Sequence, residues 1–112
     1  GRPDSEANGG GSLVCTAGQI PLDPGSGGVV GGGITGRARP VMENMAAVLD
    51  QAGASIGCVV KTTCFLGDMK DFAAFNEVYA QYFTGNPARS CVAVKALPKG
   101  VLCEVEAIAL VS

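Results

Sequence analysis

The chain has 112 residues, of which 17 are glycine and none is histidine or tryptophan, and this length predicts one domain. Without histidine the sequence excludes a Ser-His or Cys-His nucleophile pair, so any chemistry must use other polar side chains, backbone amides or bound water. The formal net charge is −2, from 8 basic and 10 acidic residues, which disfavours a surface that follows nucleic-acid phosphates.

Hydrophobic residues make up 47% of the chain, and the mean hydropathy is +0.31. Both values are high for a small domain, which has much surface to keep polar. No stretch approaches the roughly 18 apolar residues of a membrane-spanning helix, so we expect no membrane segment and some burial against another chain. The first residues do not match a signal peptide, and we expect no secretory leader.

The five cysteines are odd in number, and no two of them form a CxxC pair. We expect reduced thiols packed as small hydrophobic side chains in an intracellular protein, in the cytoplasm or alternatively the mitochondrial matrix. The spacing matches no zinc site, and we expect neither metal nor cofactor. The cysteines are Cys15, Cys58, Cys64, Cys91 and Cys103.

The start of the chain is rich in glycine. We expect a flexible segment over residues 1–12 and a single domain over 13–112. Residues 13–17 are typical of a short strand, and residues 29–30 of a weak second one, which together predict a hairpin.

A first helix is predicted over residues 40–52. Its apolar residues recur at i, i+4, i+7, i+8 and i+11, which makes one stripe along the helix. Pro40 suits the first helical position and Gly53 the end. The stripe consists of Val41, Met45, Val48, Leu49 and Ala52.

The second half of the chain alternates strands with a helix. Residues 59–66 are rich in β-branched side chains and predict a central strand. Asp68 is a candidate N-cap for a second amphipathic helix that ends near residue 83. Strands are predicted over 90–94 and about 101–111.

This order, β-β-α-β-α-β-β, predicts an α+β fold with two helices on one face of a sheet. Along residues 101–111 the odd-numbered positions from 103 onward are all apolar, whereas the even-numbered ones begin acidic and end apolar. Helices on one side leave the second face bare. We therefore expect an obligate homo-oligomer that buries this face, with carboxylates at its margin.

Four features could carry chemistry. Arg89 lies at a loop-to-strand junction, where its planar donors would suit a substrate carboxylate; the alternative is an ordinary surface or ion-pairing arginine. Glu104 and Glu106 share a strand face and could raise one another's pKa to give a general base; the alternative is a solvated or salt-bridging pair. Cys91 shares a face with Arg89, and packing is the favoured role. Gly18 ends a strand and would let a ligand approach the backbone.

The glycines at 25–33 do not form a phosphate loop. They lack the GxxxxGK[ST] pattern, and they do not follow a strand and open a helix as that loop requires. Turns explain them better.

Motifs along nearly the whole chain, from about residue 13 to 111, resemble the RidA (YjgF-like) family of reactive intermediate deaminases. The resemblance implies a chorismate-mutase-like fold with a mixed sheet, a homotrimer with a central β-barrel, and three clefts at subunit interfaces. It also implies hydrolysis of 2-aminoacrylate and 2-iminobutanoate to 2-keto acids and ammonia, without a cofactor. The motifs are GQIPLDP at 18–24, EN at 43–44, AGA at 52–54, VVKTT at 59–63, DMKDF at 68–72, NEVY at 76–79, PARS at 87–90, LPKG at 97–100 and EVEAIA at 104–109.

The resemblance assigns roles by position. Arg89 matches the arginine that holds the substrate carboxylate, and Glu104 the glutamate that positions or activates water. Cys91 and Asn76 match residues that line the cleft, and Gly18 matches the backbone beside the bound ligand. Glu106 is left with a structural role.

The chain departs from the family pattern at several positions. Asp4 stands where the family has a cleft tyrosine, in a Gly-Pro-Tyr-Ser-Gln motif, and Ala17 stands where some members have a cleft serine. Arg37 and Pro40 replace glutamines in the first helix, which should shorten it. The family's first strand, upstream of the tyrosine motif, has no counterpart.

An imine deaminase acting on a small 2-imino or 2-keto acid is therefore the leading hypothesis. A trimer that binds small carboxylates or partner proteins without catalysis is the alternative. A translation-inhibiting ribonuclease, attributed to some relatives, ranks lower because the chain has no basic patch. A chorismate mutase ranks lower still, because fold analogy alone does not carry function.

Overall fold

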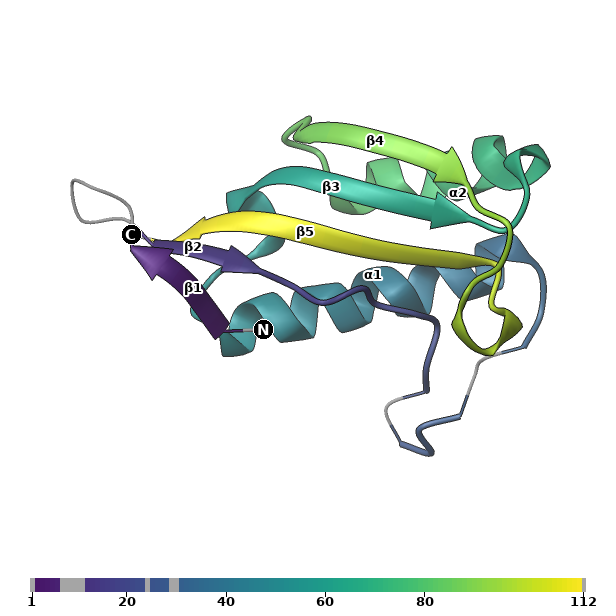
Figure 1. Cartoon of the computed structure of the whole chain (residues 1–112), viewed down its shortest axis with the longest axis horizontal. Coiled ribbons are helices and arrows are strands. Elements are labelled where there is room, and N and C mark those ends of the chain that lie inside the picture. Colours follow the sequence, from purple (N-terminus) through teal and green to yellow (C-terminus); the bar gives the residue numbers. More distant parts are fainter. Residues whose placement is uncertain (1, 7–11, 24, 29–30, 112) are drawn as a thin grey trace.

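The computed structural model describes residues 2–6, 12–23, 25–28 and 31–111 of the chain. The fold is α+β, with the strand and helix order β-β-α-β-α-β-β (Figure 1). The elements are β1 (Arg2–Glu6), β2 (Ser12–Cys15), α1 (Ile34–Gln51), β3 (Val59–Leu66), α2 (Phe72–Tyr82), β4 (Ala88–Ala93) and β5 (Cys103–Val111). This is the order expected from the sequence. The strand predicted over residues 13–17 corresponds to β2, whereas β1 was not predicted.

The five strands form one mixed sheet in the order β1-β2-β5-β3-β4. Strands β3 and β4 are parallel and are connected through α2, whereas the other neighbours are antiparallel. A parallel pair needs a crossover of this kind, because a tight turn can join only antiparallel strands.

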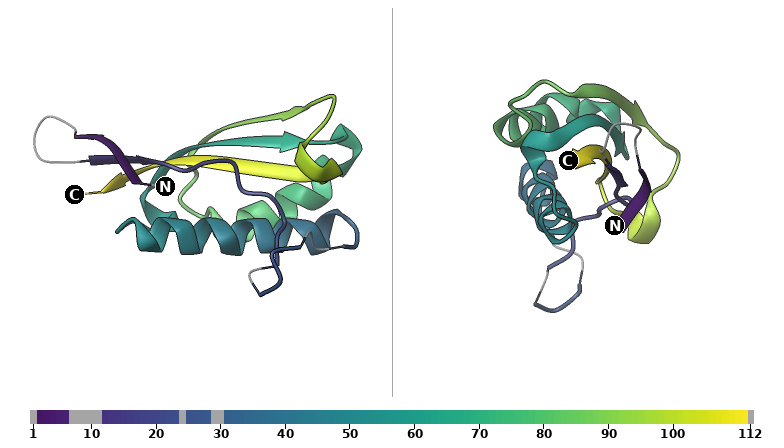
Figure 2. Two further views of the ribbon diagram at one scale, coloured as in Figure 1. Left: turned by 60° about the horizontal axis from the view of Figure 1, so that its bottom comes forward. Right: turned by 90° about the vertical axis from the view of Figure 1, so that its left-hand side faces the viewer.

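Both helices pack on the same face of the sheet, as the sequence predicts (Figure 2). The core lies between them and the sheet, where α1, α2, β3 and β5 contribute fully buried side chains. The largest of these are Phe75, Met42, Met45, Leu49 and Leu66. The helix layer therefore covers one face of the sheet and leaves the other free of helices.

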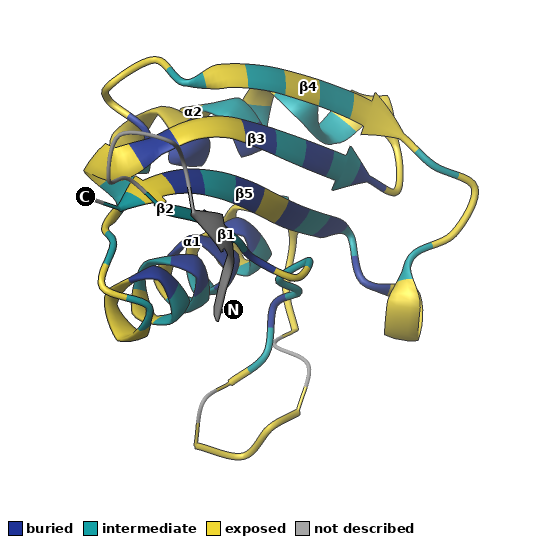
Figure 3. Ribbon diagram, turned by 60° about the vertical axis from the view of Figure 1, so that its left-hand side comes forward, coloured by how far each residue is buried: buried dark blue, intermediate teal, exposed yellow. Residues whose placement is uncertain are grey.

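Strand β5 shows how the two faces differ. Its odd-numbered residues from 103 to 109 are buried, whereas its even-numbered residues are half-buried or exposed, which confirms the predicted alternation (Figure 3). On the open face Leu110 keeps 44% of its surface exposed and Val92 on β4 keeps 46%. We call this helix-free side of the sheet the open face.

The start of the chain differs from the expectation. Residues 2–6, which fall in the segment expected to be flexible, form strand β1 and pair with β2. The predicted hairpin partner, residues 29–30, lies outside the described residues. Strand β2 already has a neighbour on each side, β1 and β5, so the hairpin over 13–30 is wrong. Backbone pairing at a sheet edge needs no particular side-chain pattern, which is why the sequence did not reveal β1.

Helix α1 is longer than predicted. It begins at Ile34 rather than at Pro40, and Pro40 lies inside it. The amide of Arg37 donates to the carbonyl of Gly33 at 3.1 Å, which closes the first turn. Buried Ala38 extends the apolar stripe toward the N-terminus, so packing against the sheet outweighs the proline. The helix ends before Gly53, whose φ of +81° suits glycine, as predicted.

The remaining elements agree with the sequence within a few residues. Strand β3 has the predicted bounds. Asp68 caps the 3-10 turn Met69–Asp71, accepting a hydrogen bond from the amide of Lys70 at 2.9 Å, and α2 follows directly. No helix in the described part of the chain has the length and apolar character needed to span a membrane.

Candidate functional site

One face of α2 gathers the side chains that surround Arg89. Phe72, Asn76 and Tyr79 are spaced by four and three residues, so they lie on the same side of the helix. That side meets β4, the edge strand of the sheet, whose Arg89 points toward the helices because it pairs in register with the fully buried Thr62.

The guanidinium of Arg89 is held by neutral groups. Its Nη1 donates to Asn76 Oδ1 at 2.5 Å, and its Cζ lies 4.6 Å from the ring centroid of Tyr79 and 5.4 Å from that of Phe72. An amide oxygen and two aromatic faces fix a guanidinium without neutralising its charge. Within the described ranges no carboxylate forms an ion pair with Arg89.

An open cavity lies beside this guanidinium. It has a volume of about 390 Å³, and Arg89, Asn76 and Tyr79 form part of its wall. A half-buried arginine at the wall of an open cavity can accept a carboxylate in bidentate geometry. The other lining residues are Ala80, Phe83, Asn86 and Pro87.

Tyr79 was expected only as an apolar position of the second helix, as was Phe72. In the structure the Tyr79 hydroxyl lies 2.7 Å from Thr62 Oγ1, and burial raises the pKa of Tyr79 above its usual value. Helical spacing from Asn76 is the signal that could have linked both aromatic residues to the site, because residues at i−4 and i+3 share its face.

Cys91 lies on the same face of β4 as Arg89 and pairs in register with Cys64. Burial raises the pKa of Cys91, although the nearby charge of Arg89 opposes the rise. Burial also raises the pKa of Cys64, to about 12. Both thiols are therefore protonated at neutral pH, which favours packing over nucleophilic chemistry. No cluster of potential metal ligands occurs in the part of the chain that the structure describes.

Glu104 and Gly18 form a second group, on the open face. The half-buried side chain of Glu104 crosses directly over Gly18, so a Cβ built on residue 18 would overlap Glu104 Oε2. Two backbone hydrogen bonds between Gln19 and Val105, of 2.7 and 3.0 Å, hold the segments together. Ala17 is exposed, and its carbonyl accepts a hydrogen bond from Gln19 Nε2 at 3.0 Å. Gly18 thus leaves room for the Glu104 carboxylate. The close approach of a ligand to the Gly18 backbone stays a prediction.

Arg89 and Glu104 lie on opposite faces of the sheet. Arg89 pairs with Thr62, which pairs with Ala107, and both of these partners are buried on the helix side. Glu104 pairs with Phe65 on the open face. One chain by itself therefore cannot bring Arg89 and Glu104 to the same substrate.

Glu106 also lies on the open face, beside a cavity of about 230 Å³ over the centre of the sheet. Lys61 and Thr63 of β3 line this cavity with it. Asp4 lies in β1, where the backbone register with β2 shifts between Pro3 and Ser5.

The chain is similar to known proteins over nearly its whole length. The family model described as Endoribonuclease L-PSP matches residues 4–111. A RutC family protein of Pyrococcus horikoshii is 51% identical over 108 residues, covering 96% of this chain and 86% of that protein. A 2-iminobutanoate/2-iminopropanoate deaminase of Salmonella typhimurium is 47% identical over 104 residues, covering 89% and 80%.

A solved structure extends the likeness to three dimensions. TdcF of E. coli with bound serine has a TM-score of 0.84 to this chain at 44% identity, over 89% of this chain and 81% of TdcF. The mixed sheet with two helices is thus shared with a relative whose sequence is also similar. The chain belongs to the RidA (YjgF-like) family, as its motifs predict.

Proposed function

We propose that this protein is a deaminase that hydrolyses small 2-imino and 2-enamino acids, such as 2-iminobutanoate and 2-aminoacrylate, to 2-keto acids and ammonia. The observation that carries the proposal is the setting of Arg89, a cation held by an amide and two aromatic rings beside an open cavity. The 47% identity to a 2-iminobutanoate/2-iminopropanoate deaminase supports the choice of substrate.

In this proposal Arg89 binds the substrate carboxylate. Guanidinium and carboxylate can form two parallel hydrogen bonds, which fix the orientation of the substrate as well as its position. Asn76 accepts a hydrogen bond from Nη1, so the remaining guanidinium N–H groups are available to a substrate carboxylate. Cys91 does not line the cavity beside Arg89, and burial raises the pKa of its thiol, so we assign it packing rather than chemistry.

Glu104 of a second copy completes the site. Since Arg89 and Glu104 lie on opposite faces of one sheet, a cleft that contains both needs the helix-side edge of one chain and the open face of another. A homotrimer with the open faces turned inward, as in the family resemblance, would bury Leu110 and Val92 and form three such clefts. Gly18 of the second copy would lie beside the substrate with Glu104.

The chemistry then needs no histidine, because an imine carbon is already electrophilic. The oxygen of a water bonds to C2, while one water proton passes through the Glu104 carboxylate to the imine nitrogen. When the resulting carbinolamine collapses, its hydroxyl proton takes the same route to nitrogen, the C–N bond breaks and ammonia leaves. An enamine substrate first gains a proton at C3 and loses one from nitrogen, which converts it to the imine.

The test couples the purified protein to a threonine dehydratase and follows loss of the imine by semicarbazone formation, together with release of ammonia. We expect Arg89→Ala to lower kcat/KM about 100-fold, which corresponds to about 2.7 kcal/mol of lost carboxylate binding. Arg39→Ala, which removes an exposed arginine of α1, is the matched control and should behave as the wild type. Equal rates for Arg89→Ala and wild type would refute the proposal.

Binding of small carboxylates without turnover is a second candidate, favoured by the serine bound to TdcF. It predicts heat of binding for a 2-keto acid and no ammonia release in the coupled assay. The Endoribonuclease L-PSP description of the family raises a further outcome. RNA cleavage that persists through purification and disappears in Arg89→Ala would assign the site to that reaction instead.

A further inference from the structure

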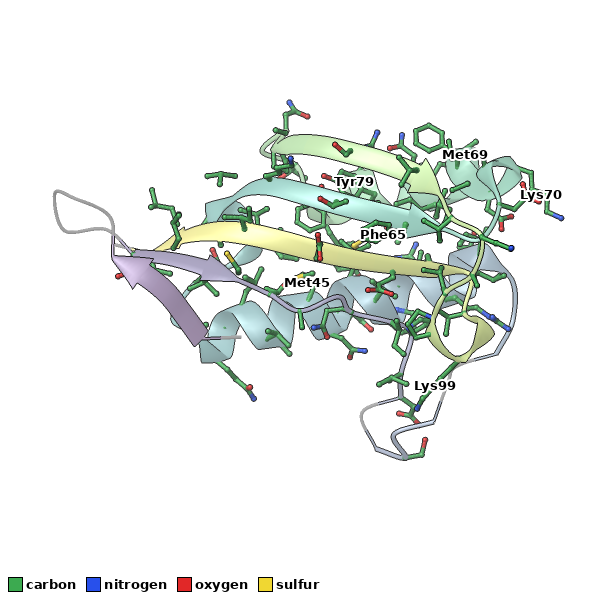
Figure 4. All side chains as sticks on the ribbon, in the orientation of Figure 1. Met45, Phe65, Met69, Lys70, Tyr79 and Lys99 are labelled. Atoms are coloured by element: carbon green, nitrogen blue, oxygen red, sulfur yellow. The ribbon has the colours of Figure 1, made fainter. Side chains whose placement is uncertain are left out.

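The ring of Tyr79 is restrained on several sides. Tyr79 is 6% exposed, and its hydroxyl is hydrogen-bonded to the fully buried hydroxyl of Thr62. The ring of Phe83 stacks on it with centroids 4.6 Å apart and planes inclined by 26°, and the ring of Phe75 lies 6.2 Å away. Tyr79, labelled in Figure 4, contacts β3 through Thr62 and β4 through Arg89. A ring held in this way has one orientation.

The guanidinium of Arg89 lies over the ring of Tyr79, with Cζ 4.6 Å from the ring centroid. One turn earlier on α2, Asn76 holds Nη1. Phe72 of the same helix lies farther away, with its ring centroid 5.4 Å from Cζ. Three residues of one helix therefore surround the guanidinium, and the ring of Tyr79 is the nearer of the two aromatic rings.

We propose that Tyr79 is a positioning residue for Arg89: the Thr62 hydroxyl fixes the phenol ring, and the ring fixes the plane of the guanidinium that would receive a substrate carboxylate. The consequence for catalysis rests on the proposed function, whereas the positioning itself does not. Tyr79 acts through Arg89 and does not touch the reacting atoms.

A role in packing alone would not require the hydroxyl of Tyr79. A buried hydroxyl costs free energy unless it finds a partner, so phenylalanine would fill the same space more simply. The structure instead contains a matched pair of buried hydroxyls, one on β3 and one on α2. Because burial raises the pKa of Tyr79, the phenol remains protonated at neutral pH and the hydrogen bond is kept.

Four variants separate the parts of this arrangement. Tyr79→Leu removes the aromatic face, and Tyr79→Phe keeps the face but loses the hydrogen bond. Thr62→Val removes the same bond from the other side, and the double variant Thr62→Val/Tyr79→Phe removes both hydroxyls at once. Val78→Ala is the control for lost packing, because Val78 is buried in the same helix and its side chain has no interaction with Arg89.

The first measurement needs neither ligand nor activity. The side-chain Nε–H signal of Arg89, assigned by its loss in Arg89→Lys, should be shifted upfield in the wild-type NMR spectrum by the ring current of Tyr79. Tyr79→Leu should remove at least half of that shift, and Val78→Ala should keep it. A wild-type signal at the position of unstacked arginines, or one that Tyr79→Leu does not move, would overturn the proposal.

The second measurement compares the dissociation constant of 2-oxobutanoate, the KM for the imine and kcat. We expect Tyr79→Leu to raise the dissociation constant and KM about tenfold, with kcat within about twofold of wild type, because a carboxylate clamp acts on bound substrate and transition state alike. Tyr79→Phe and Thr62→Val should each raise the dissociation constant and KM about threefold. The double variant should also show about threefold, not ninefold, since all three remove one bond.

The outcomes distinguish this proposal from the proposed function. A wild type that releases no ammonia, yet shows the upfield Arg89 signal and the expected loss in Tyr79→Leu, would refute the deaminase and support the positioning role. A wild type that hydrolyses the imine but shows an unstacked Arg89 signal would support the deaminase and refute the positioning role. Equal dissociation constants for Tyr79→Leu and Val78→Ala would also overturn the positioning role.

Discussion

At the scale of single residues, Gly18 shows how the absence of a side chain shapes the site. The carboxylate of Glu104 occupies the space that a Cβ at residue 18 would need. The far end of a glutamate side chain is flexible and can move aside at little cost to the fold. The cost of a side chain here should therefore fall on the position of the carboxylate rather than on stability.

Gly18→Ala is expected to lower kcat for imine hydrolysis at least tenfold, because it displaces the Glu104 carboxylate, which we propose transfers the water proton. The free energy of unfolding should change by less than about 1 kcal/mol. Steady-state kinetics and denaturant unfolding measure the two quantities on the same preparation.

Gly36→Ala is the matched control, since a Cβ at residue 36 meets nothing within 4 Å. It lies in α1 and should add up to about 1 kcal/mol of stability with unchanged kcat. A Gly18→Ala protein with wild-type kcat would show that the placement of Glu104 over Gly18 does not matter for the reaction.

The sequence could predict which residues share a strand face, but not what lies across from them. Alternation along β4 and β5 correctly paired Arg89 with Cys91 and Glu104 with Glu106. It could not place Tyr79 under Arg89, because a tyrosine at an apolar helical position has the same pattern whether or not a cation lies on its ring. Contacts between elements depend on their packing, which local periodicity does not contain.

At the scale of elements, helix α1 shows that local sequence signals do not always predict where a helix begins. Proline suits the first position of a helix, so the sequence predicted a start at Pro40, yet the helix begins at Ile34. An apolar stripe that includes buried Ala38 and Met42 anchors the first turns to the sheet. Helix propensity scales do not include the energy of that packing. The end at Gly53 could be predicted because glycine is the residue that adopts a positive φ most easily.

Pro40→Ala is expected to raise the free energy of unfolding by about 1 kcal/mol, because it restores the amide that Gly36 lacks as a partner for its carbonyl in the helix. Thermal and urea unfolding at a fixed protein concentration would measure the change. Ala47→Gly, at an exposed position of the same helix, should lower stability by about 1 kcal/mol. A Pro40→Ala protein less stable than wild type would mean that the ring of Pro40 contributes more by packing than it costs the helix.

At the scale of the whole molecule, the sheet separates the two proposed catalytic side chains. Arg89 belongs to the helix side and Glu104 to the open face. Alternation within β5 predicted the faces of that strand, but the opposition between β4 and β5 follows only from the strand order and register, which the sequence did not provide.

Mixing inactive variants tests whether two copies share each site. Arg89→Ala and Glu104→Gln should each be inactive alone. Co-refolded in equal amounts into symmetric assemblies, they should place an intact Arg89 opposite an intact Glu104 in about one quarter of the clefts, and recover about one quarter of wild-type activity. A mixture that remains as inactive as its components would contradict a shared site.

The placement of Arg89 and Glu104 on opposite faces of the sheet affects how a mutant allele is inherited. If each chain contributes half of one site and half of the next, a chain that lacks both groups inactivates two clefts in every assembly it joins. A cell that makes equal amounts of the normal chain and of the doubly altered chain would then keep about one quarter of its sites, where independent chains would keep half. We therefore expect such an allele to be partly dominant, although each altered chain is simply inactive.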